Sequence, residues 1–307
     1  NPRAKVQHIR ILGTCGGSTS DEAAAIRWAA GLAVAGVPIN PTPADVINLS
    51  LGGPGPCTSA EQQAIDAATK AGSIVVVAAG NDNLDLDVSS YSPASCTSVI
   101  TVAAVETNGS RLFLNNSTAS NYGSKVEIAA PGRNVISTMN TGTTTSTSSW
   151  NYLGKTGTSM ATPTVAGVVS LMLSHDNTLN LIQIIKLLQE TASPFPAGST
   201  CSSNIAATNF CGPGIVNAGA AMQSLVSVVP LDTLETFRPQ RVLDTRDGTG
   251  GVPIARVGNT NGTAPDLAFT ITGKGGVPTT GVDAVSLNIT ATQTTATDFG
   301  GYVTVYP

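Results

Sequence analysis

The chain has 307 residues, of which 41% are apolar and only 11% are charged; its net charge is −4 and its pI is near 5.1. This length suffices for one large domain and a small second one. The mildly acidic balance argues against nucleic acid or an anionic membrane as a partner. No apolar run is long enough to span a bilayer, so we do not expect a transmembrane protein.

The first two thirds of the sequence alternate between strand-like and helix-like patterns. Apolar, β-branched runs predict buried strands at residues 6–12, 46–51, 74–79, 99–105 and 125–129. Capping residues and helical apolar spacing predict five helices. The first, at residues 21–35, has a Thr19/Glu22 capping box, and the second runs from a Thr58/Glu61 capping box to Gly72. The others are at 158–174, at 180–191 and after a cap at Asn217. A Thr/Ser-rich loop is expected at residues 139–150. This alternation predicts an α/β fold with a doubly wound parallel sheet.

The pattern changes near Pro230, after which helical periodicity disappears. Short alternating runs split by Gly and Pro predict a small C-terminal all-β module. We therefore expect one domain over residues 1–229 and a β-rich accessory module, itself incomplete, over 230–307. The stretch 241–248 resembles a β-sandwich-like module appended to secreted actinobacterial proteins, which suggests surface or polymer binding by analogy only.

Five cysteines occur, and none forms a CxxC metal or redox pair. Sparse cysteines in a polar, Thr-rich chain are typical of structural disulfides in an oxidising compartment, so we expect a secreted protein. Buried free thiols are the alternative. Their positions favour the pairs Cys57–Cys96 and Cys201–Cys211. Cys15 is left over, and its partner is expected in a segment that precedes this chain.

The strongest local signal is the heptapeptide Gly-Thr-Ser-Met-Ala-Thr-Pro at residues 157–163. It places Ser159 where a tight turn enters a helix, at the positive end of the helix dipole. There, the backbone N–H of the serine can face a developing oxyanion. Pro163 is expected in the first helical turn, where a missing N–H costs little. The alternative is a serine that only caps the helix.

Two further segments follow predicted strands. Asn81 comes after a buried strand and Gly80, so its side-chain amide can donate to an oxyanion; the alternative is an ordinary turn. Two glycines end the segment 48–53, and they leave a backbone edge with which an extended peptide can pair. The alternative there is an ordinary strand end.

Taken together, these segments resemble the subtilisin-like serine protease family, most closely its proteinase K-like secreted branch. The matching stretches, in family order, are 46–53, 75–81, 91–94, 121–123, 130–132 and 157–163, within about residues 4–225. The resemblance implies that Ser159 is the nucleophile and Asn81 the oxyanion donor. Losing such a donor costs roughly 3–4 kcal/mol of transition-state stabilisation, a magnitude that belongs to the family.

The same resemblance implies that the substrates are proteins or peptides and that the protein is a monomer. It also implies a pocket for the residue before the scissile bond, with a preference for medium apolar or aromatic side chains. Its two walls are Leu49, Ser50, Leu51, Gly52 and Gly53 on one side and Ala78, Ala79 and Gly80 on the other.

The resemblance breaks at the other two catalytic residues. The family order is Asp, His, Ser, and neither the Asp motif nor the His motif occurs here. Of the two histidines, His8 lies in the first predicted strand as a core or edge residue, and His175 ends the helix after the nucleophile. We expect the missing pair upstream of this chain, and without a base the chain alone is expected to be inactive.

No cofactor is expected in catalysis, but the resemblance implies a structural calcium ion. Its ligands would be the Glu127 carboxylate and backbone carbonyls near Thr97 and Val99, a hard oxygen set that suits calcium. A solvated glutamate is the alternative.

Two functions remain open from the sequence. The first is a secreted serine endopeptidase whose Asp and His lie upstream. The second is a non-enzymatic secreted pseudoprotease with a surface- or polymer-binding module. The sequence upstream of this chain would distinguish them.

Overall fold

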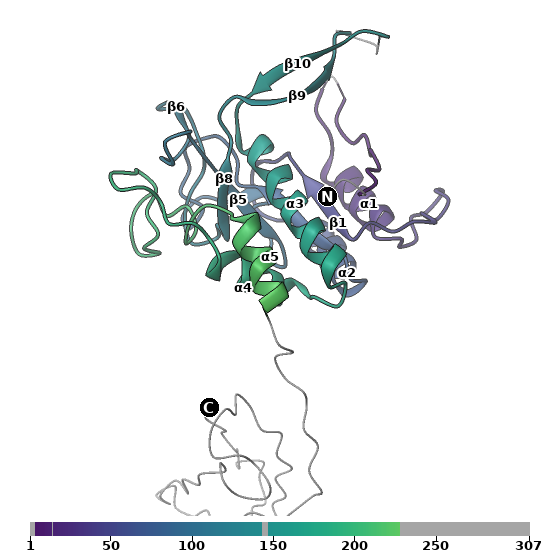
Figure 1. The fold of residues 1–307 in the computed structure, drawn as a ribbon. Helices are drawn as coiled ribbons and strands as arrows, with labels where there is room; N and C mark the ends of the chain where they lie inside the picture. Colours follow the sequence, from purple (N-terminus) through teal and green to yellow (C-terminus); the bar gives the residue numbers. More distant parts are fainter. Residues whose placement is uncertain (1–3, 14, 143–146, 228–307) are drawn as a thin grey trace, which may run out of the picture. The chain divides into compact units, whose positions relative to one another are not determined.

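The computed structural model describes residues 4–13, 15–142 and 147–227 (Figure 1). The chain divides into two units, Asn1–Val229 and Pro230–Pro307. The predicted C-terminal β module lies outside the described residues, so its architecture stays a prediction. Among the described helices, none is both long enough and apolar enough to cross a membrane.

A parallel four-stranded sheet forms the centre of the described unit. Its strands, in spatial order, are β1 (Val46–Leu49), β3 (Ile74–Ala78), β5 (Ile100–Val105) and β8 (Ile128–Pro131). Every residue of β3 and β5 is buried, as expected for parallel strands that are covered on both faces. This burial explains why both strands read as unbroken apolar runs in the sequence.

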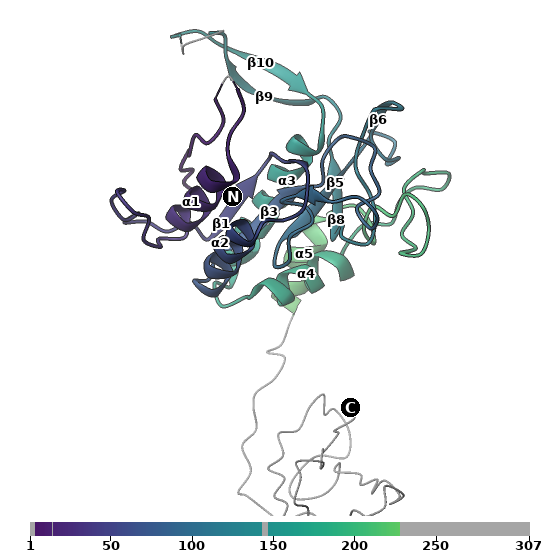
Figure 2. The ribbon, with the colours of Figure 1, turned by 180° about the vertical axis from the view of Figure 1, so that it is seen from behind.

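Helices cover both faces of the sheet (Figures 1 and 2). The helices are α1 (Thr19–Ala29) and α2 (Ser59–Lys70) on one face, and α3 (Thr158–His175), α4 (Leu181–Glu190) and α5 (Ala218–Ser227) on the other. Alternate residues of β3 point to opposite faces, so Val75 and Val77 pack in the core on the α1–α2 side and Val76 packs on the α3 side. The predicted α/β fold with a parallel sheet is confirmed.

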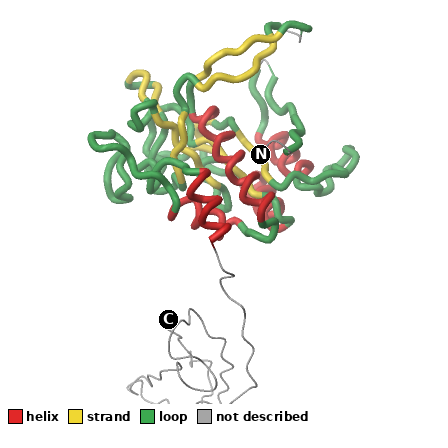
Figure 3. Tube along the Cα trace, viewed as in Figure 1, coloured by secondary structure: helices red, strands yellow, loops and turns green. Residues whose placement is uncertain are grey.

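Within the described residues, three short antiparallel ribbons lie outside the sheet. They pair β2 (Gly53–Pro54) with β4 (Tyr91–Ser92), β6 (Phe113–Asn115) with β7 (Thr118–Ala119), and β9 (Val135–Asn140) with β10 (Trp150–Lys155). The ribbon of β9 and β10 projects from the layers and appears as the long yellow pair in Figure 3. It includes both ends of the segment 139–150, for which we predicted only a loop.

The predicted strand at residues 6–12 is wrong. This segment has no strand structure, and Val6 and Leu12 are 74% and 51% exposed. A strand needs a hydrogen-bonded neighbour, and among the described strands β1 pairs only with β3, never with this segment. His8 therefore lies on an exposed stretch rather than in a core.

Helix α1 differs from its prediction at both ends. Its N-cap is Ser18, whose hydroxyl accepts the Asp21 N–H at 3.1 Å, so the predicted Thr19/Glu22 capping box is wrong. The helix ends at Ala29 and not near residue 35, because Gly31 adopts a φ of 75° that α-helix does not allow. Glu22, which the prediction placed in that capping box, is buried.

Other local predictions are confirmed. The Thr58/Glu61 capping box opens α2, and Asn217 accepts the N–H of Ala220 at the start of α5. The disulfides Cys57–Cys96 and Cys201–Cys211 are present, with Cα–Cα distances of 5.1 and 5.5 Å. Cys15 is exposed and forms no disulfide among the described residues, so its partner in another segment stays a prediction.

Two buried carboxylates, Glu22 and Glu61, lie in the first turns of α1 and α2. Glu61 is fully buried; it accepts hydrogen bonds from the Thr58 N–H and hydroxyl and, at 2.8 Å, from the Ser92 hydroxyl. Glu22 is 8% exposed, and its Oε1 atom has no hydrogen-bond partner. Burial, followed by the charge of Glu61, raises the pKa of Glu22 to about 7.

This raised pKa predicts a pH-dependent stability. The folded protein keeps a proton on Glu22 up to about pH 7, whereas the unfolded chain releases it near the ordinary value of 4.5. Raising the pH through this window therefore destabilises the fold. The wild type should lose unfolding free energy between pH 5 and pH 8. We expect this loss to be smaller in Glu22→Gln by on the order of 1–3 kcal/mol.

Urea denaturation at the two pH values measures this difference. Asp21→Asn is the matched control, because it removes an exposed carboxylate one residue away. The same decline with pH in Glu22→Gln and in the wild type would contradict the assignment.

Candidate active site

The candidate site lies where the carboxyl ends of β1 and β3 meet the N-terminus of α3. Ser50 directly follows β1, Asn81 follows β3 after two residues, and Ser159 is the second residue of α3. Crevices at the carboxyl ends of parallel strands are the usual ligand sites of α/β sheets. The structure therefore brings together three of the residues that the sequence singled out.

Gly157 forms the turn into the nucleophile. Its φ is 145°, and its N–H donates to the carbonyl of Gly132 at 2.9 Å. A Cβ atom here would lie 3.3 Å from Asn81 Oδ1. A glycine is needed for the backbone conformation and for this close approach.

The side chain of Asn81 is fixed by the first residue of α3. Its Oδ1 accepts the Thr158 N–H at 2.9 Å and the Thr158 hydroxyl at 3.2 Å. The same hydroxyl accepts the N–H of Gly80 at 3.2 Å. Because two donors fix the carbonyl end of the amide, its Nδ2 end faces the other way, and no described residue accepts its protons. This end can donate to an oxyanion.

Pro163 is the sixth residue of α3, so the expectation that it lies in the first turn is wrong. In an α-helix the N–H of residue 163 would bond the carbonyl of residue 159. Proline cannot donate, and the Ser159 carbonyl instead accepts the Ser50 hydroxyl at 2.8 Å. This hydrogen bond attaches the nucleophile's backbone to the end of β1, a role for Ser50 that the sequence did not reveal.

One glycine from each of the two predicted pocket walls lies close to the Tyr91 ring. A Cβ atom on Gly52 or on Gly80 would come within 2.8 or 2.6 Å of Tyr91 Cε1. Both glycines have positive φ, at 156° and 101°. Glycine at both positions therefore lets the Tyr91 ring approach the backbone of both walls closely.

The wall residues differ in accessibility. Leu49, Ala78 and Ala79 are buried in the core, whereas Gly52 is exposed and Ser50, Leu51 and Gly53 are half-buried. Only the second group can touch a substrate with its side chain or backbone. The assignment of these walls to substrate stays a prediction.

A cavity of about 170 Å³ opens beside Asn81. Its lining joins the nucleophile turn to the β6–β7 ribbon and comprises Asn81, Thr156, Gly157, Leu112, Leu114, Thr118 and Ala119. Asn81 thus lies next to a partly open, largely apolar space.

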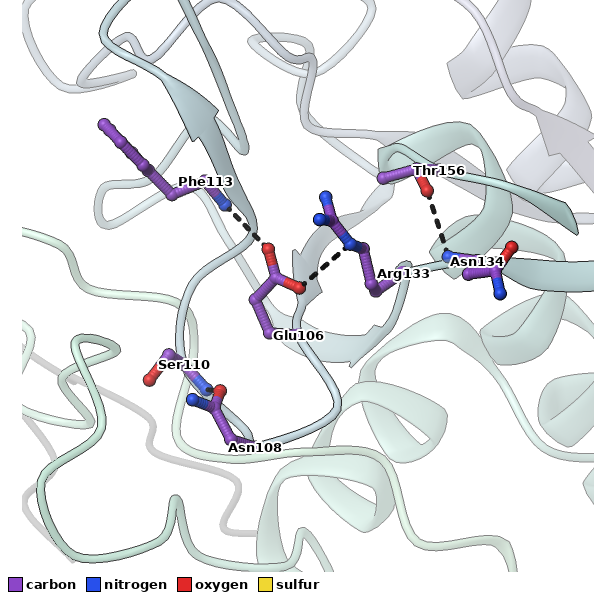
Figure 4. A network of polar contacts seen from close by, with 7 residues as sticks. All are labelled: Glu106, Asn108, Ser110, Phe113, Arg133, Asn134 and Thr156. Carbon is purple, nitrogen blue, oxygen red and sulfur yellow. Dashed lines mark hydrogen bonds and ion pairs between the residues drawn. The ribbon is translucent and has the colours of Figure 1, made fainter.

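Polar contacts hold the base of the β9–β10 ribbon (Figure 4). Glu106 forms an ion pair with Arg133 at 3.4 Å and accepts the Phe113 N–H at 3.2 Å. The Asn134 N–H donates to Thr156 Oγ1 at 3.0 Å. These contacts fix Arg133 and Asn134, which lead into β9, and Thr156, which follows β10 and leads into Gly157.

Neither histidine of the chain forms a hydrogen bond with Ser159 among the described residues. His175 is the last residue of α3. It lies 175 − 159 = 16 residues beyond the nucleophile, or roughly 24 Å along the helix at about 1.5 Å per residue. His8 lies on the exposed stretch described above, and no hydrogen bond links it to Ser159 in the described part of the chain.

Glu127 directly precedes β8. Its Oε2 accepts the Thr101 N–H at 2.6 Å, and burial raises the pKa of its carboxyl group to about 7. The carbonyl of Thr97 accepts the Gln62 side-chain amide at 3.1 Å, and Val99 is buried nearby in the chain. The Glu127 carboxylate is thus engaged by Thr101, and the Thr97 carbonyl already has a donor. The fit to a calcium site is therefore partial.

Comparison with protein families shows to which family the chain belongs. The model described as the Subtilase family matches residues 1–227. The chain belongs to the subtilase family. This membership agrees with the positions of Ser159 and Asn81.

Several subtilase relatives are similar in sequence. The "Extracellular protease" of Xanthomonas campestris pv. campestris is 46% identical over 270 residues, which cover 88% of this chain and 42% of the relative. The "Extracellular basic protease" of Dichelobacter nodosus is 37% identical and covers 84% and 44%. "Subtilisin DY" of Bacillus licheniformis is 35% identical and covers 72% and 69%. The chain thus spans less than half the length of the first two relatives.

A solved structure supports the subtilase fold. The structure titled "Proteases from Pseudoalteromonas arctica PAMC 21717" has a TM-score of 0.61 and 44% identity, and the match covers 70% of this chain and 61% of that one.

The link between Ser50 and Ser159 in this subtilase predicts a specific coupling. Ser50→Ala leaves the Ser159 carbonyl without a donor, which should lower the unfolding free energy by about 1–2 kcal/mol. In a Pro163→Ala background the new N–H can bond that carbonyl, so Ser50→Ala should cost much less. A double-mutant cycle by urea denaturation measures this coupling.

Ser174→Ala is the matched control, because it removes an exposed hydroxyl at the far end of α3. It should change stability by less than about 0.5 kcal/mol in both backgrounds. If Ser50→Ala lowers the unfolding free energy equally in the two backgrounds, the N–H that Pro163→Ala introduces does not replace the Ser50 hydroxyl as the donor to the Ser159 carbonyl, and the account is refuted.

Proposed function

We propose that this subtilase chain carries the nucleophile and the oxyanion donor of a secreted serine endopeptidase that hydrolyses proteins or peptides. The observation that carries the proposal is the orientation of Asn81 beside Ser159. Its Oδ1 is held by Thr158 at 2.9 Å, which leaves Nδ2 free at the N-terminus of α3. The names of two relatives, "Extracellular protease" and "Extracellular basic protease", support secretion and a protein substrate.

The chemistry follows an acyl-enzyme route. Ser159 Oγ attacks the scissile carbonyl carbon while a histidine base takes the hydroxyl proton. The carbonyl oxygen becomes an oxyanion and accepts hydrogen bonds from Asn81 Nδ2 and the Ser159 N–H. The C–N bond then breaks as the proton passes to the leaving amine. Water, deprotonated by the same base, releases the second product and restores the serine.

The residues that activate Ser159 are not among the chain's own histidines. His175 is at the opposite end of α3, and His8 is exposed on a stretch without helix or strand. We therefore propose that a His–Asp pair outside these 307 residues completes the triad. On its own, this chain should hydrolyse peptides at near-background rates, with a peptide groove but no base.

Covalent labelling tests the nucleophile. The natural full-length protein that contains this chain should react with a fluorophosphonate probe, and peptide mapping should place the label on Ser159. Ser159→Ala should abolish labelling, whereas Ser174→Ala on the same helix should retain it. The 307-residue chain should label at a small fraction of this rate because it lacks the base.

Two outcomes would overturn the proposal. Labelling that persists in Ser159→Ala would assign the nucleophile elsewhere. A full-length protein that never labels but binds peptides would indicate a non-enzymatic binding protein.

We further propose that Glu127 helps to hold a structural calcium ion. Its carboxylate accepts the Thr101 N–H, and a divalent cation would compensate its buried charge. Carbonyls near Thr97 and Val99 would complete the set once the Gln62 amide gives way. The ion would fix the start of β8 to the segment before β5.

Thermal melting tests this ion. At pH 8, calcium should raise the melting temperature of the wild type above its value in chelator by several degrees, as expected for a ligand that binds only the folded state. Glu127→Gln should lose most of this shift, and Glu190→Gln, an exposed carboxylate on α4, should keep it. No calcium-dependent shift in the wild type would remove the ion from the account.

A further inference from the structure

The turn that carries Asn81 is bonded to a second segment of the chain, which follows β7. The Ala119 N–H donates to the Asn81 carbonyl at 3.1 Å, and the Asn121 N–H donates to the Gly80 carbonyl at 2.8 Å. These backbone contacts bring the side chain of Asn121 against the turn. Asn121 is 0% exposed, so its side chain faces the protein and not a substrate.

The side-chain amide of Asn121 forms three hydrogen bonds with this turn. Its Oδ1 accepts the N–H groups of Asp82 at 3.0 Å and Leu84 at 2.8 Å, and its Nδ2 donates to the Ala79 carbonyl at 2.8 Å. Two backbone donors identify the first end as the oxygen, because an amide nitrogen could not accept them. One buried side chain thus binds the backbone both before and after Asn81.

Gly80 leaves the space that this contact needs. A Cβ atom on Gly80 would clash with Asn121 Nδ2, and the φ of Gly80 is 101°. A larger residue would therefore push the amide away from the Ala79 carbonyl, which is buried and needs a donor. The glycine next to the oxyanion donor is required by Asn121 as well as by the Tyr91 ring.

Two side chains therefore act on Asn81 in different ways. Thr158 bonds the Asn81 Oδ1 atom and sets the direction of Nδ2. Asn121 bonds the backbone on both sides and sets the place from which the Asn81 side chain extends. An oxyanion donor acts at about 2.7–3.1 Å, and a misplacement of about 1 Å can cost roughly a hundredfold in rate.

We propose that Asn121 is a positioning residue for oxyanion stabilisation: its amide holds the turn at residues 79–84 so that Asn81 Nδ2 reaches the oxyanion. This inference rests on the proposed endopeptidase function. A carboxamide suits the task because it offers an acceptor to two N–H groups and a donor to one carbonyl at the same time. A carboxylate lacks the donor, and an apolar side chain lacks both.

A double-mutant cycle on the natural full-length protein tests the inference, with kcat measured on a saturating peptide substrate. Asn121→Ala should lower kcat by about tenfold to a hundredfold, because the donor is misplaced. Asn81→Ala should itself lower kcat by roughly 10²–10³. In that background Asn121→Ala should cost about twofold or less, because no donor is left to position.

Asn40→Ala is the matched control. Asn40 is also a buried asparagine, at 2% exposed, and its amide bonds the Ala29 carbonyl and the Thr42 N–H in the loop between α1 and β1. Its loss should lower stability in urea denaturation. It should change kcat by about twofold or less in both backgrounds, as expected for a site that does not couple to Asn81.

Each outcome decides between the inference and the proposed function. An Asn121→Ala loss in kcat that is equal in both backgrounds, or a kcat close to that of the wild type, overturns the positioning role. If Asn81→Ala leaves kcat unchanged, the inference fails, but the endopeptidase function stands as long as hydrolysis depends on Ser159. No hydrolysis by the wild type removes both.

A second variant covers the case in which Asn121→Ala does not fold. Asn121→Asp keeps the shape and the acceptor for the two N–H groups and replaces only the N–H group that faces the Ala79 carbonyl. It should lower kcat in the wild-type background and have little effect in the Asn81→Ala background. An equal loss in both backgrounds overturns the positioning role here too.

Discussion

The hydrogen bonds between Thr158 and Asn81 are the interaction on which the site depends. One amide oxygen accepts both the N–H and the hydroxyl of Thr158, at 2.9 and 3.2 Å, and so joins the end of β3 to the start of α3. The same hydroxyl also accepts the Gly80 N–H. Two segments that are far apart in the sequence, Gly80–Asn81 after β3 and the start of α3, thus share one buried side chain, since Thr158 is 0% exposed. The direction of the Asn81 Nδ2 donor follows from this arrangement.

The backbone of Ser159, the proposed nucleophile, is also secured at the start of α3. Pro163 removes the N–H that would bond the Ser159 carbonyl, and Ser50 supplies a donor from the end of β1. Gly157 lets the turn approach Asn81 closely. The nucleophile is therefore held by contacts from two neighbouring strands of a buried sheet, and it does not rely on the helix alone.

The sequence predicted the features that depend on local pattern. Continuous apolar runs indicated β3 and β5, capping residues indicated α2 and α5, and the heptapeptide around Ser159 indicated the start of α3. The sequence prediction failed where a hydrogen-bonding partner distant in the sequence determines the local structure. Residues 6–12 have a strand-like pattern but no paired neighbour, and the β9–β10 ribbon forms in a segment whose Thr and Ser residues suggested a loop.

The same limit applies within the site. The sequence indicated Ser159 and Asn81. It did not indicate that Thr158 orients the Asn81 amide or that Ser50 binds the Ser159 carbonyl, because these hydrogen bonds span 77 and 109 residues. Glu22 was predicted to be a capping residue at the helix start, and only the packing of α1 on α2 shows it as a buried acid. A capping pattern reports hydrogen bonds near in sequence and carries no information about burial.

The geometry of the oxyanion site is the central claim, and a crystal structure of the phosphonylated full-length protein tests it most directly. The phosphonyl oxygen on Ser159 stands in for the oxyanion of the tetrahedral intermediate. The account predicts that this oxygen lies about 2.7–3.1 Å from both Asn81 Nδ2 and the Ser159 backbone N–H, with Asn81 Oδ1 still bonded to Thr158. A phosphonyl oxygen that points to solvent, with Asn81 Nδ2 bonded to another protein group, would contradict it.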